Sequence, residues 1–417
     1  MSKTELPDKF IWSKDSKTDL SEMVADRSRS PCPPSSSASH LRSLKVLQEL
    51  RALVQGGASF RMQSDGPSAI ETVGAAGGGI LECATSGSSG KPKIIRRSHR
   101  SWIASFEINA GLFDLSPDDT YAVLGSLEHS LSLYGALEAG HIGANLCVLA
   151  GLRGERQLKL LQQTGVTTLY TTPTQLEVLT TIGRQDFRFE RMKRIFIGGG
   201  ALSMALAEKC RALFSQAELF PFYGASETSF ITIANADSPE GSVGMAYPNV
   251  EISIRGETGQ VTSGIGEIWV RSPYLFAGYG EPVVSDTRHH NEFVTVGEYG
   301  LLDERANLFI KGRRSRMVTV SDQNIFPDEI EQFLSANCKV GPLAVVPMSD
   351  EKRGHRLAVV ATDETRRAAL EDAIVLCRKT LGVHHAPKYI FFLKSLPQLA
   401  SGKLDYSKIN AWIEDQL

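Results

Sequence analysis

The chain has 417 residues, of which 42% are hydrophobic and 22% are charged, and its formal net charge is −2. This length allows a large core and two or three domains, and the near-neutral charge gives no indication of a nucleic-acid or membrane surface. The six cysteines form no CxxC pair, and the nine histidines form no HExxH pattern. We therefore predict buried thiols in a reducing cytosol, with neither a disulfide framework nor a structural metal site.

Residues 1–40 are predicted to form a flexible N-terminal arm that ends in the serine- and proline-rich linker RSRSPCPPSSSASH. The segment before the linker is either a short docking arm or disordered. The first residues are charged and lack the apolar core of a signal peptide. No run approaches the about 18 apolar residues that a membrane span requires, so we expect a cytoplasmic protein.

The middle of the chain alternates helical and strand-like patterns. Leucines recur at helical spacing over 40–55, and further helical patterns lie at 155–163 and 173–181. Short apolar runs at 122–124, 146–149, 169–170 and 194–197 separate them. This alternation predicts a parallel sheet flanked by helices. From Val250 the segments VEISIRG and GEIWVRS indicate an antiparallel sheet or small barrel, and together these elements predict a large α/β domain over 41–313.

A third pattern begins near Arg314. A strand at 317–321 precedes a helix that opens at Pro327, where proline suits the first helical turn. Strands at 344–347, 357–362 and 388–393, a helix over 364–381 and a terminal helix from Tyr406 complete the pattern. We predict a separate small α+β domain over 314–417.

The nine residues TSGSSGKPK, from Thr85 to Lys93, follow an apolar stretch at 79–81. Glycine permits the positive φ angles that turn successive N–H groups toward an anion, and hydroxyls add donors. The run differs from a Walker loop because no serine or threonine follows Lys91. The alternative is a solvated linker. The candidate phosphate-binding residues are Thr85, Ser86, Gly87, Ser88, Ser89, Gly90 and Lys93.

Four further segments contain residues suited to nucleotide chemistry. The strand FI runs into GGGALS, whose Gly199, Gly200 and Ala201 would allow a flat ligand to approach, although strand-to-helix packing is the simpler explanation. The turn YGASET joins an aromatic ring to the carboxylate of Glu227, which in isolation is a solvated charge.

The other two segments supply cations. Arg313 follows a strand at 308–310, and arginine pairs with phosphate or ribose oxygens in a bidentate manner. Lys403 lies in the glycine loop LASGK, where the alternative is an ordinary surface cation.

In this order, the segments TSGSSGKPK, GGGALS, YGASET, GEIWVRSPYLFAGY, VGEYGLLD, KGR, FPDEIE and LPQLASGKLD resemble the motif series of the adenylate-forming (AMP-binding) superfamily. That superfamily comprises acyl- and aryl-CoA synthetases, nonribosomal-peptide adenylation domains and luciferases. The resemblance covers roughly 81–408, most of the chain. It implies a large N-terminal domain, a small mobile C-terminal domain and ATP-dependent activation of a carboxylate to an acyl-adenylate, with release of pyrophosphate.

The resemblance also implies a role for each motif. The phosphate loop holds the β- and γ-phosphates, Glu227 holds Mg²⁺, and Lys403 bridges the attacking carboxylate and the α-phosphate. Tyr223 stacks on adenine, and Arg313 binds ribose or phosphate. The remaining candidate nucleotide-binding residues are Gly199, Gly200, Ala201, Gly224, Ser226 and Glu298.

Four features depart from the family pattern. Glu298 stands where the family has a ribose-binding aspartate, with Asp303 as a possible substitute. Ser315 occupies the hinge position, and a small residue can absorb its backbone rotation. Asp322 stands where the family has a glycine that lines the pantetheine tunnel, so it is expected to hinder CoA or phosphopantetheine. About 80 residues precede the phosphate loop, fewer than in most members.

The acid is addressed by the segment LEHSLSLYG, which starts at Leu127 and carries His129, our third candidate catalytic residue beside Lys403 and Glu227. The resemblance places an aspartate here in members that activate amino acids, and this chain has none. We therefore expect a fatty or aryl carboxylic acid, with CoA or an acyl carrier protein as acceptor. The alternatives are an amino-acid-activating enzyme and a catalytically degenerate nucleotide-binding member.

Overall fold

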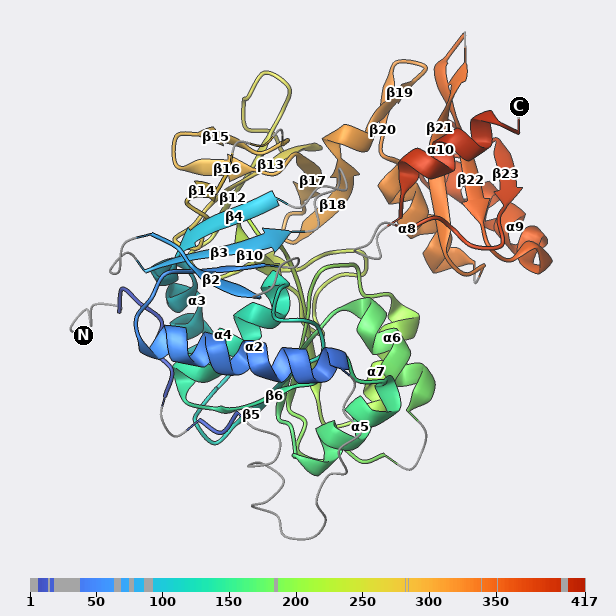
Figure 1. The fold of residues 1–417 in the computed structure, drawn as a ribbon. Coiled ribbons are helices and arrows are strands. Elements are labelled where there is room, and N and C mark those ends of the chain that lie inside the picture. Colours follow the sequence, from blue (N-terminus) through green and yellow to red (C-terminus); the bar gives the residue numbers. More distant parts are fainter. Residues whose placement is uncertain are drawn as a thin grey trace.

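The computed structural model describes residues 7–13, 16–18, 38–63, 69–74, 79–85, 93–183, 187–281, 283, 285–338, 340–350, 352–398 and 404–416. Three sheets belong to a large N-terminal part, and a fourth belongs to a small C-terminal part that stands to one side (Figure 1). The fold is therefore the expected large α/β domain with a small antiparallel subdomain and a small α+β domain. Six predicted site residues lie outside the described residues: Ser86, Gly87, Ser88, Ser89, Gly90 and Lys403.

The first sheet has the strand order β14-β4-β3-β1-β2. Its strands are β1 (Phe60–Met62), β2 (Ile70–Thr72), β3 (Ile80–Thr85), β4 (Lys93–Ser98) and β14 (Gly278–Tyr279). Strands β3 and β4 are antiparallel, and their last pair is Thr85 with Lys93. The two ends of the predicted phosphate loop therefore lie side by side, where the neighbouring strands β3 and β4 end and begin.

The second sheet contains the predicted parallel strands. Its order is β11-β10-β9-β8-β7-β5-β6; β5 to β9 pair with one another in parallel, and β10 is antiparallel to β9. The strands are β5 (Thr120–Val123), β6 (Asn145–Val148), β7 (Thr168–Thr171), β8 (Arg194–Ile197), β9 (Glu218–Ala225), β10 (Ser229–Ile233) and β11 (Met245–Ala246). The four apolar runs noted in the sequence are β5 to β8, which confirms the prediction.

Helices cover both faces of this sheet (Figure 1). They are α2 (Ala38–Gln55), α3 (His99–Leu112), α4 (Ser130–Ile142), α5 (Gly154–Gln163), α6 (Pro173–Ile182) and α7 (Met204–Leu213). Alternate strand residues serve two cores: Tyr121 and Val123 pack with α3, α4 and the first sheet, whereas Ala122 packs with α5 to α7. Helix α6 begins at a capping box between Thr172 and Gln175, which satisfies its first free N–H groups.

The third sheet forms the antiparallel subdomain. Its order is β15-β16-β13-β17-β18, with β12 paired to β13. The strands are β12 (Glu251–Arg255), β13 (Gly266–Arg271), β15 (Arg288–His290), β16 (Phe293–Thr295), β17 (Glu298–Leu302) and β18 (Leu308–Arg313). Strand β18 extends through Gly312 and Arg313, so these residues belong to the strand that we expected them to follow.

The small part follows a short 3₁₀ turn, η1 (Arg314–Arg316). Its elements are β19 (Val318–Val320), β20 (Gln323–Ile325), α8 (Pro327–Asn337), β21 (Leu343–Asp350), β22 (Gly354–Ala361), η2 (Glu364–Arg366), α9 (Arg367–Thr380), β23 (Tyr389–Phe392) and α10 (Tyr406–Glu414). The predicted helix over 364–381 starts as the 3₁₀ turn η2 because the Asp363 side chain accepts a hydrogen bond from the Thr365 N–H.

The described residues of the N-terminal arm pack on the large part. The Phe10 ring stacks on His99 with centroids 4.0 Å apart, and Trp12 lies against Gly140, where an added Cβ would come within 2.7 Å of the indole. The Leu146 N–H donates to the Lys17 carbonyl at 3.0 Å. These contacts favour the docking-arm alternative for residues 7–13 and 16–18.

The five cysteines that the structure describes are free and buried: Cys83, Cys147, Cys210, Cys338 and Cys377. Cys32 lies outside the described residues. Over the described ranges, none of the helices has the length and apolar character that crossing a bilayer demands. The described side chains also contain no group of three or more His, Cys, Asp or Glu that could hold a metal ion.

A fully buried carboxyl lies between α4 and the second sheet. Glu138 accepts hydrogen bonds from the Tyr170 hydroxyl at 2.6 Å and from the Asn109 side-chain amide at 2.7 Å. Burial raises the pKa of Glu138 to about 7, although both donors oppose this rise. The carboxyl is therefore neutral at low pH and becomes a buried anion as the pH passes 7.

We predict that Glu138→Gln removes a pH-dependent loss of stability. The pKa of Glu138 in the folded state lies above its usual value of 4.5. The contribution of Glu138 to the free energy of unfolding is therefore largest below pH 4.5, and it declines as the pH rises to about 7. Over this interval the wild type should lose up to about 3 kcal/mol relative to the variant, with no further change above it. Urea unfolding followed by tryptophan fluorescence, from pH 4.5 to 8.5, measures the difference.

The matched control is Glu155→Gln, which removes an exposed glutamate that is paired with Lys159 on α5. Its unfolding free energy should run parallel to that of the wild type between pH 5 and 8. A Glu138→Gln curve that is also parallel to the wild type would show that the carboxyl is not titrated in this range.

Candidate active site

The carboxyl ends of β8 and β9 form the base of the site, as in other open α/β sheets. Strand β8 runs into Gly198, where an added Cβ would lie 2.3 Å from the ring of Phe222 on β9. Gly199 has a φ of +81°, which favours glycine. Gly199, Gly200 and Ala201 are exposed. The main chain of these three residues is covered by no large side chain of their own, and it lies beside β9.

The hairpin of β9 and β10 carries four candidate residues: Tyr223, Gly224, Ser226 and Glu227. Tyr223 and Gly224 belong to β9 itself, and the turn begins only after Ala225. At Gly224 an added Cβ would lie 1.9 Å from the Ser229 carbonyl oxygen, so only glycine fits. The Thr228 hydroxyl accepts from the Ala225 N–H at 3.1 Å and tightens the turn. Tyr223 and Glu227 are thereby held at the two ends of one rigid segment.

A first polar cluster joins β9 to the antiparallel subdomain. The Tyr223 hydroxyl donates to one oxygen of Glu298, and the Arg313 Nε donates to the other at 3.3 Å. Glu298 and Arg313 are direct partners in the β17–β18 pairing. Burial and the adjacent Glu298 raise the pKa of Tyr223, which keeps the phenol protonated as a donor.

Asp303, the possible substitute for Glu298, serves a different purpose. Its carboxylate accepts from the N–H groups of Arg305 and Asn307 at 2.9 and 2.8 Å, and it thereby closes the turn between β17 and β18. Glu298 is the carboxylate that the structure brings to Tyr223 and Arg313.

A second polar cluster surrounds Glu227. The Tyr279 hydroxyl donates to its carboxylate at 2.8 Å, and the Lys93 ammonium lies 5.9 Å from the centre of the Tyr279 ring. The Phe276 N–H donates to the Glu227 carbonyl at 2.8 Å. Burial raises the pKa of Tyr279 to about 12. Since Lys93 is paired with Thr85, the ends of the phosphate loop lie beside Glu227.

The acid-pocket segment reaches the same hairpin. The Ser130 and Ser226 hydroxyls are 3.0 Å apart. His129 is the N-cap residue of α4, is exposed and makes no capping hydrogen bond. The structure therefore brings His129 next to the turn that carries Glu227.

The carboxylate of Glu227 fits a magnesium ion that is shared with phosphate. Mg²⁺ in nucleotide sites takes one or two carboxylates, with phosphate oxygens and water completing its shell. Glu227 is half-buried, and one of its oxygens accepts the Tyr279 hydrogen bond.

Polar contacts also cross from the large part to the small part. The Arg313 N–H donates to Asp328 on α8 at 3.4 Å, and Lys311 forms an ion pair with Glu329. Tyr299 and Phe326 pack with ring centroids 5.5 Å apart. The polypeptide at the proposed nucleotide site is therefore in direct contact with the small part.

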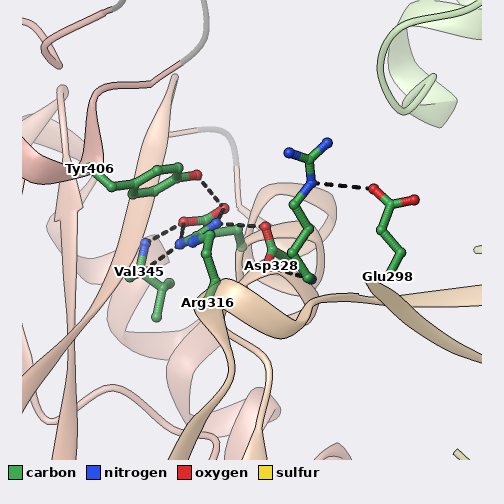
Figure 2. A network of polar contacts seen from close by, with 7 residues as sticks. Glu298, Arg316, Asp328, Val345 and Tyr406 are labelled. Atoms are coloured by element: carbon green, nitrogen blue, oxygen red, sulfur yellow. Dashed lines mark hydrogen bonds and ion pairs between the residues drawn. The ribbon is translucent and has the colours of Figure 1, made fainter. Parts of the chain in front are cut away.

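Arg316, just beyond the hinge position, is bound within the small part (Figure 2). Its guanidinium donates to Asp328 at 2.6 Å and to the Val345 carbonyl at 2.9 Å, and it forms a second ion pair with Glu331. It lies 3.6 Å from the centre of the Tyr406 ring. Ser315 is exposed between this anchored residue and Arg313.

Asp322 lies in the turn between β19 and β20. Its φ is +65° and that of Ser321 is +49°, values that favour glycine. The Asp322 side chain is exposed.

Three residues that contact the candidate site were not singled out in the sequence. Arg97 is buried below the Glu227 turn, Tyr279 binds Glu227, and Asp328 binds the backbone of Arg313. Tyr279 and Asp328 lie inside the quoted motifs GEIWVRSPYLFAGY and FPDEIE, so their positions were marked in the sequence, whereas Arg97 lies outside every quoted motif.

Comparisons with known proteins agree with this geometry. The model of the family described as "AMP-binding enzyme" matches residues 82–280, and that of the "AMP-binding enzyme C-terminal domain" matches 329–403. An uncharacterized acyl–CoA ligase, YhfT, of Bacillus subtilis is 34% identical over 338 residues, which are 80% of this chain and 68% of the relative.

Two further matches are similar in extent. The putative long chain fatty acid-CoA ligase VraA of Staphylococcus aureus is 27% identical over 78% of this chain and 69% of its own length. The structure of o-succinylbenzoate CoA synthetase (MenE) from Bacillus subtilis with an acyl-adenylate has a TM-score of 0.70 at 24% identity, covering 83% of this chain and 72% of that chain. The latter likeness supports the fold.

We predict opposite outcomes for alanine at two glycines of the site. Gly224→Ala should destabilise the large part by about 3 kcal/mol or more, because the Cβ would overlap a backbone oxygen that cannot move independently. Gly200→Ala should change stability by less than about 1 kcal/mol, since its nearest neighbour is Pro173 at an ordinary 3.5 Å. Urea unfolding midpoints compare the two, and equal midpoints would contradict the close approach at Gly224.

Proposed function

The chain belongs to the family of AMP-binding enzymes, and we propose that it uses ATP to convert a fatty or aryl carboxylic acid into an acyl-adenylate before the acyl group passes to a thiol. As an acid–thiol ligase, it acts on a small-molecule acid. The observation that carries the proposal is the pair of polar clusters around Glu298 and Glu227, which lie on the two sides of one hairpin. They suit the adenosine and phosphate ends of one nucleotide.

The reaction requires charge neutralisation and alignment. The carboxylate attacks the α-phosphorus of ATP, the bond to the β-phosphate oxygen breaks, and pyrophosphate leaves. Both reactants are anions, so the protein must supply positive charge and hold the groups in line.

We assign the adenosine to the first cluster. Tyr223 would lie against adenine, and the exposed backbone of Gly199, Gly200 and Ala201 leaves room for the base. Glu298 would accept hydrogen bonds from the ribose hydroxyls, and Arg313 holds that carboxylate in place. Gly224 and Ser226 form the backbone between adenosine and phosphate.

We assign the triphosphate to the loop from Thr85 to Lys93, whose N–H groups and hydroxyls suit the β- and γ-phosphates. Glu227 would hold Mg²⁺, which neutralises the phosphate oxygens and orients the triphosphate. Lys93 adds a cation at the end of the loop. Lys403 would reach the attacking carboxylate and the α-phosphate from the small domain, which we take to be residues 314–417.

The acid is proposed to enter beside α4. The segment from Leu127 offers apolar side chains and His129, and it lacks an aspartate to pair with an amino group. A long-chain or aryl acid suits these residues, and the name of VraA points to long-chain fatty acids for that relative. The acceptor is CoA or the phosphopantetheine of an acyl carrier protein.

The decisive experiment measures pyrophosphate release with ATP, Mg²⁺ and a panel of fatty, aryl and amino acids. We expect release with a fatty or aryl acid, and we expect Lys403→Ala to lower its rate by about 10³-fold, comparable with the loss of another charge-stabilising group. ATP binding by the variant should stay within about threefold.

The control for this variant is Lys394→Ala, which removes an exposed lysine of the same domain and should keep the wild-type rate. Pyrophosphate release with amino acids, but with no fatty or aryl acid, would show that the enzyme activates amino acids and would contradict the proposed substrate class. A wild-type chain that releases no pyrophosphate with any acid would be the degenerate nucleotide-binding member, and the proposal would fail.

We predict that Asp322→Gly accelerates the thioester step with CoA about tenfold or more while adenylation is unchanged. The change removes a carboxylate that repels the CoA phosphates, and glycine suits the φ of +65°. Ser321→Gly is the matched control, since it relaxes the neighbouring φ of +49° and keeps the charge. Acyl-CoA formation from a fixed amount of acyl-adenylate measures the step, and equal rates for both variants would exclude the charge effect.

A further inference from the structure

Arg97 is a fully buried cation at the inward side of β4, with an exposed fraction of 0%. Its guanidinium donates to the Ser226 carbonyl at 2.5 Å, to the Tyr274 carbonyl at 3.2 Å and to the Ser101 hydroxyl at 3.2 Å. It lies 4.8 Å from the centre of the Trp102 ring. All of these partners are neutral.

Among the described residues of the large part, the lack of an ion-pair partner distinguishes Arg97 from Arg194, the other buried arginine. Arg194 is paired with Asp119 at 3.1 Å, whereas no ion pair of Arg97 occurs among the described residues. The Arg97 Nε is also buried without a hydrogen-bond partner in this part of the chain. A buried charge that forms no ion pair is costly to the fold, which indicates a role other than stability.

The carbonyls that Arg97 binds belong to the two segments that hold Glu227. Ser226 immediately precedes Glu227 in the hairpin turn, and Tyr274 lies in the segment that leads to β14. The same two segments are joined by the Phe276 N–H, which donates to the Glu227 carbonyl, and by the Tyr279 hydroxyl, which donates to its carboxylate. The Arg97 guanidinium adds a side-chain contact from β4, the strand that follows the predicted phosphate loop, to both segments. The second segment is also paired with β4 through the backbone of β14.

We propose that Arg97 is a positioning residue that fixes the Glu227 turn against β4, and thereby sets the position of the Glu227 carboxylate relative to the magnesium-bound triphosphate. The proposal deepens the proposed function and rests on it. Arginine suits this task because its planar group donates in several fixed directions and stacks on an aromatic ring, whereas lysine is a point charge on a flexible chain.

The test measures ATP binding by titration calorimetry, with Mg²⁺ and with EDTA, for the wild type, Arg97→Lys and Arg97→Met. We expect the wild type to bind ATP more tightly with Mg²⁺. Both variants should raise the Mg²⁺ concentration for half-maximal binding at least tenfold and leave the EDTA affinity within about threefold. Arg194→Lys is the control. It alters a buried arginine that is paired with Asp119 and that lies at the start of β8, whereas the candidate site lies at the other end of this strand.

A milder variant covers the case in which an Arg97 variant does not fold. Ser101→Ala removes one acceptor of the guanidinium and keeps the charge. It should weaken Mg²⁺-dependent binding by twofold or more in the same direction. Circular dichroism confirms the folded state of each protein.

The outcomes separate this proposal from the function. Wild-type affinity in the Arg97 variants, or equal losses with Mg²⁺ and with EDTA, would overturn the positioning role and leave the function intact. A similar loss in Arg194→Lys would assign the effect to general destabilisation and would also overturn it. A wild-type chain that binds no ATP would overturn the function and this proposal together.

Discussion

The close backbone approach of Gly224 to the Ser229 carbonyl is the constraint on which the site depends. It allows β9 and β10 to form a tight hairpin at the carboxyl edge of the parallel sheet. Tyr223 faces the antiparallel subdomain from one end of this hairpin, and Glu227 faces the phosphate loop from the other. Three sheets thereby contribute residues to the candidate site. A side chain at position 224 would force β9 and β10 apart and displace Tyr223 and Glu227.

The parallel core was predictable because its strands are short apolar runs bounded by helices, and each run serves two cores. The first sheet was not, because β1 and β2 have three residues each and carry no periodic pattern of their own. The docking of Phe10 and Trp12 was also left open, since an arm rich in polar residues shows its few apolar anchors only when their partners are known. A local sequence pattern can predict a helix or strand, but contacts with distant residues decide whether a short strand or an arm is bound to the rest of the fold.

The sequence motifs predicted which residue types form the candidate site, but they did not predict which of these residues contact one another. Glu298 and Arg313 were identified separately, and only the β17–β18 pairing shows that one holds the other. Two of the partners of Arg97 are main-chain carbonyls more than a hundred positions away, and a carbonyl leaves no mark in a sequence. Tyr279 lies inside a recognised motif, yet its bond to Glu227 depends on how β14 joins the first sheet.

The contacts on the two sides of Ser315 restrict how the small part can move. Arg316 is bound to Asp328, Glu331 and Val345, so it must travel with the small part. Lys311 is anchored in β18, and its ion pair with Glu329 must break in any rotation. The Arg313 N–H must likewise release Asp328, while its side chain can stay with Glu298. The backbone rotation that we propose, which would bring Lys403 to the nucleotide, would therefore be confined to the residues between Arg313 and Arg316, where Ser315 is exposed.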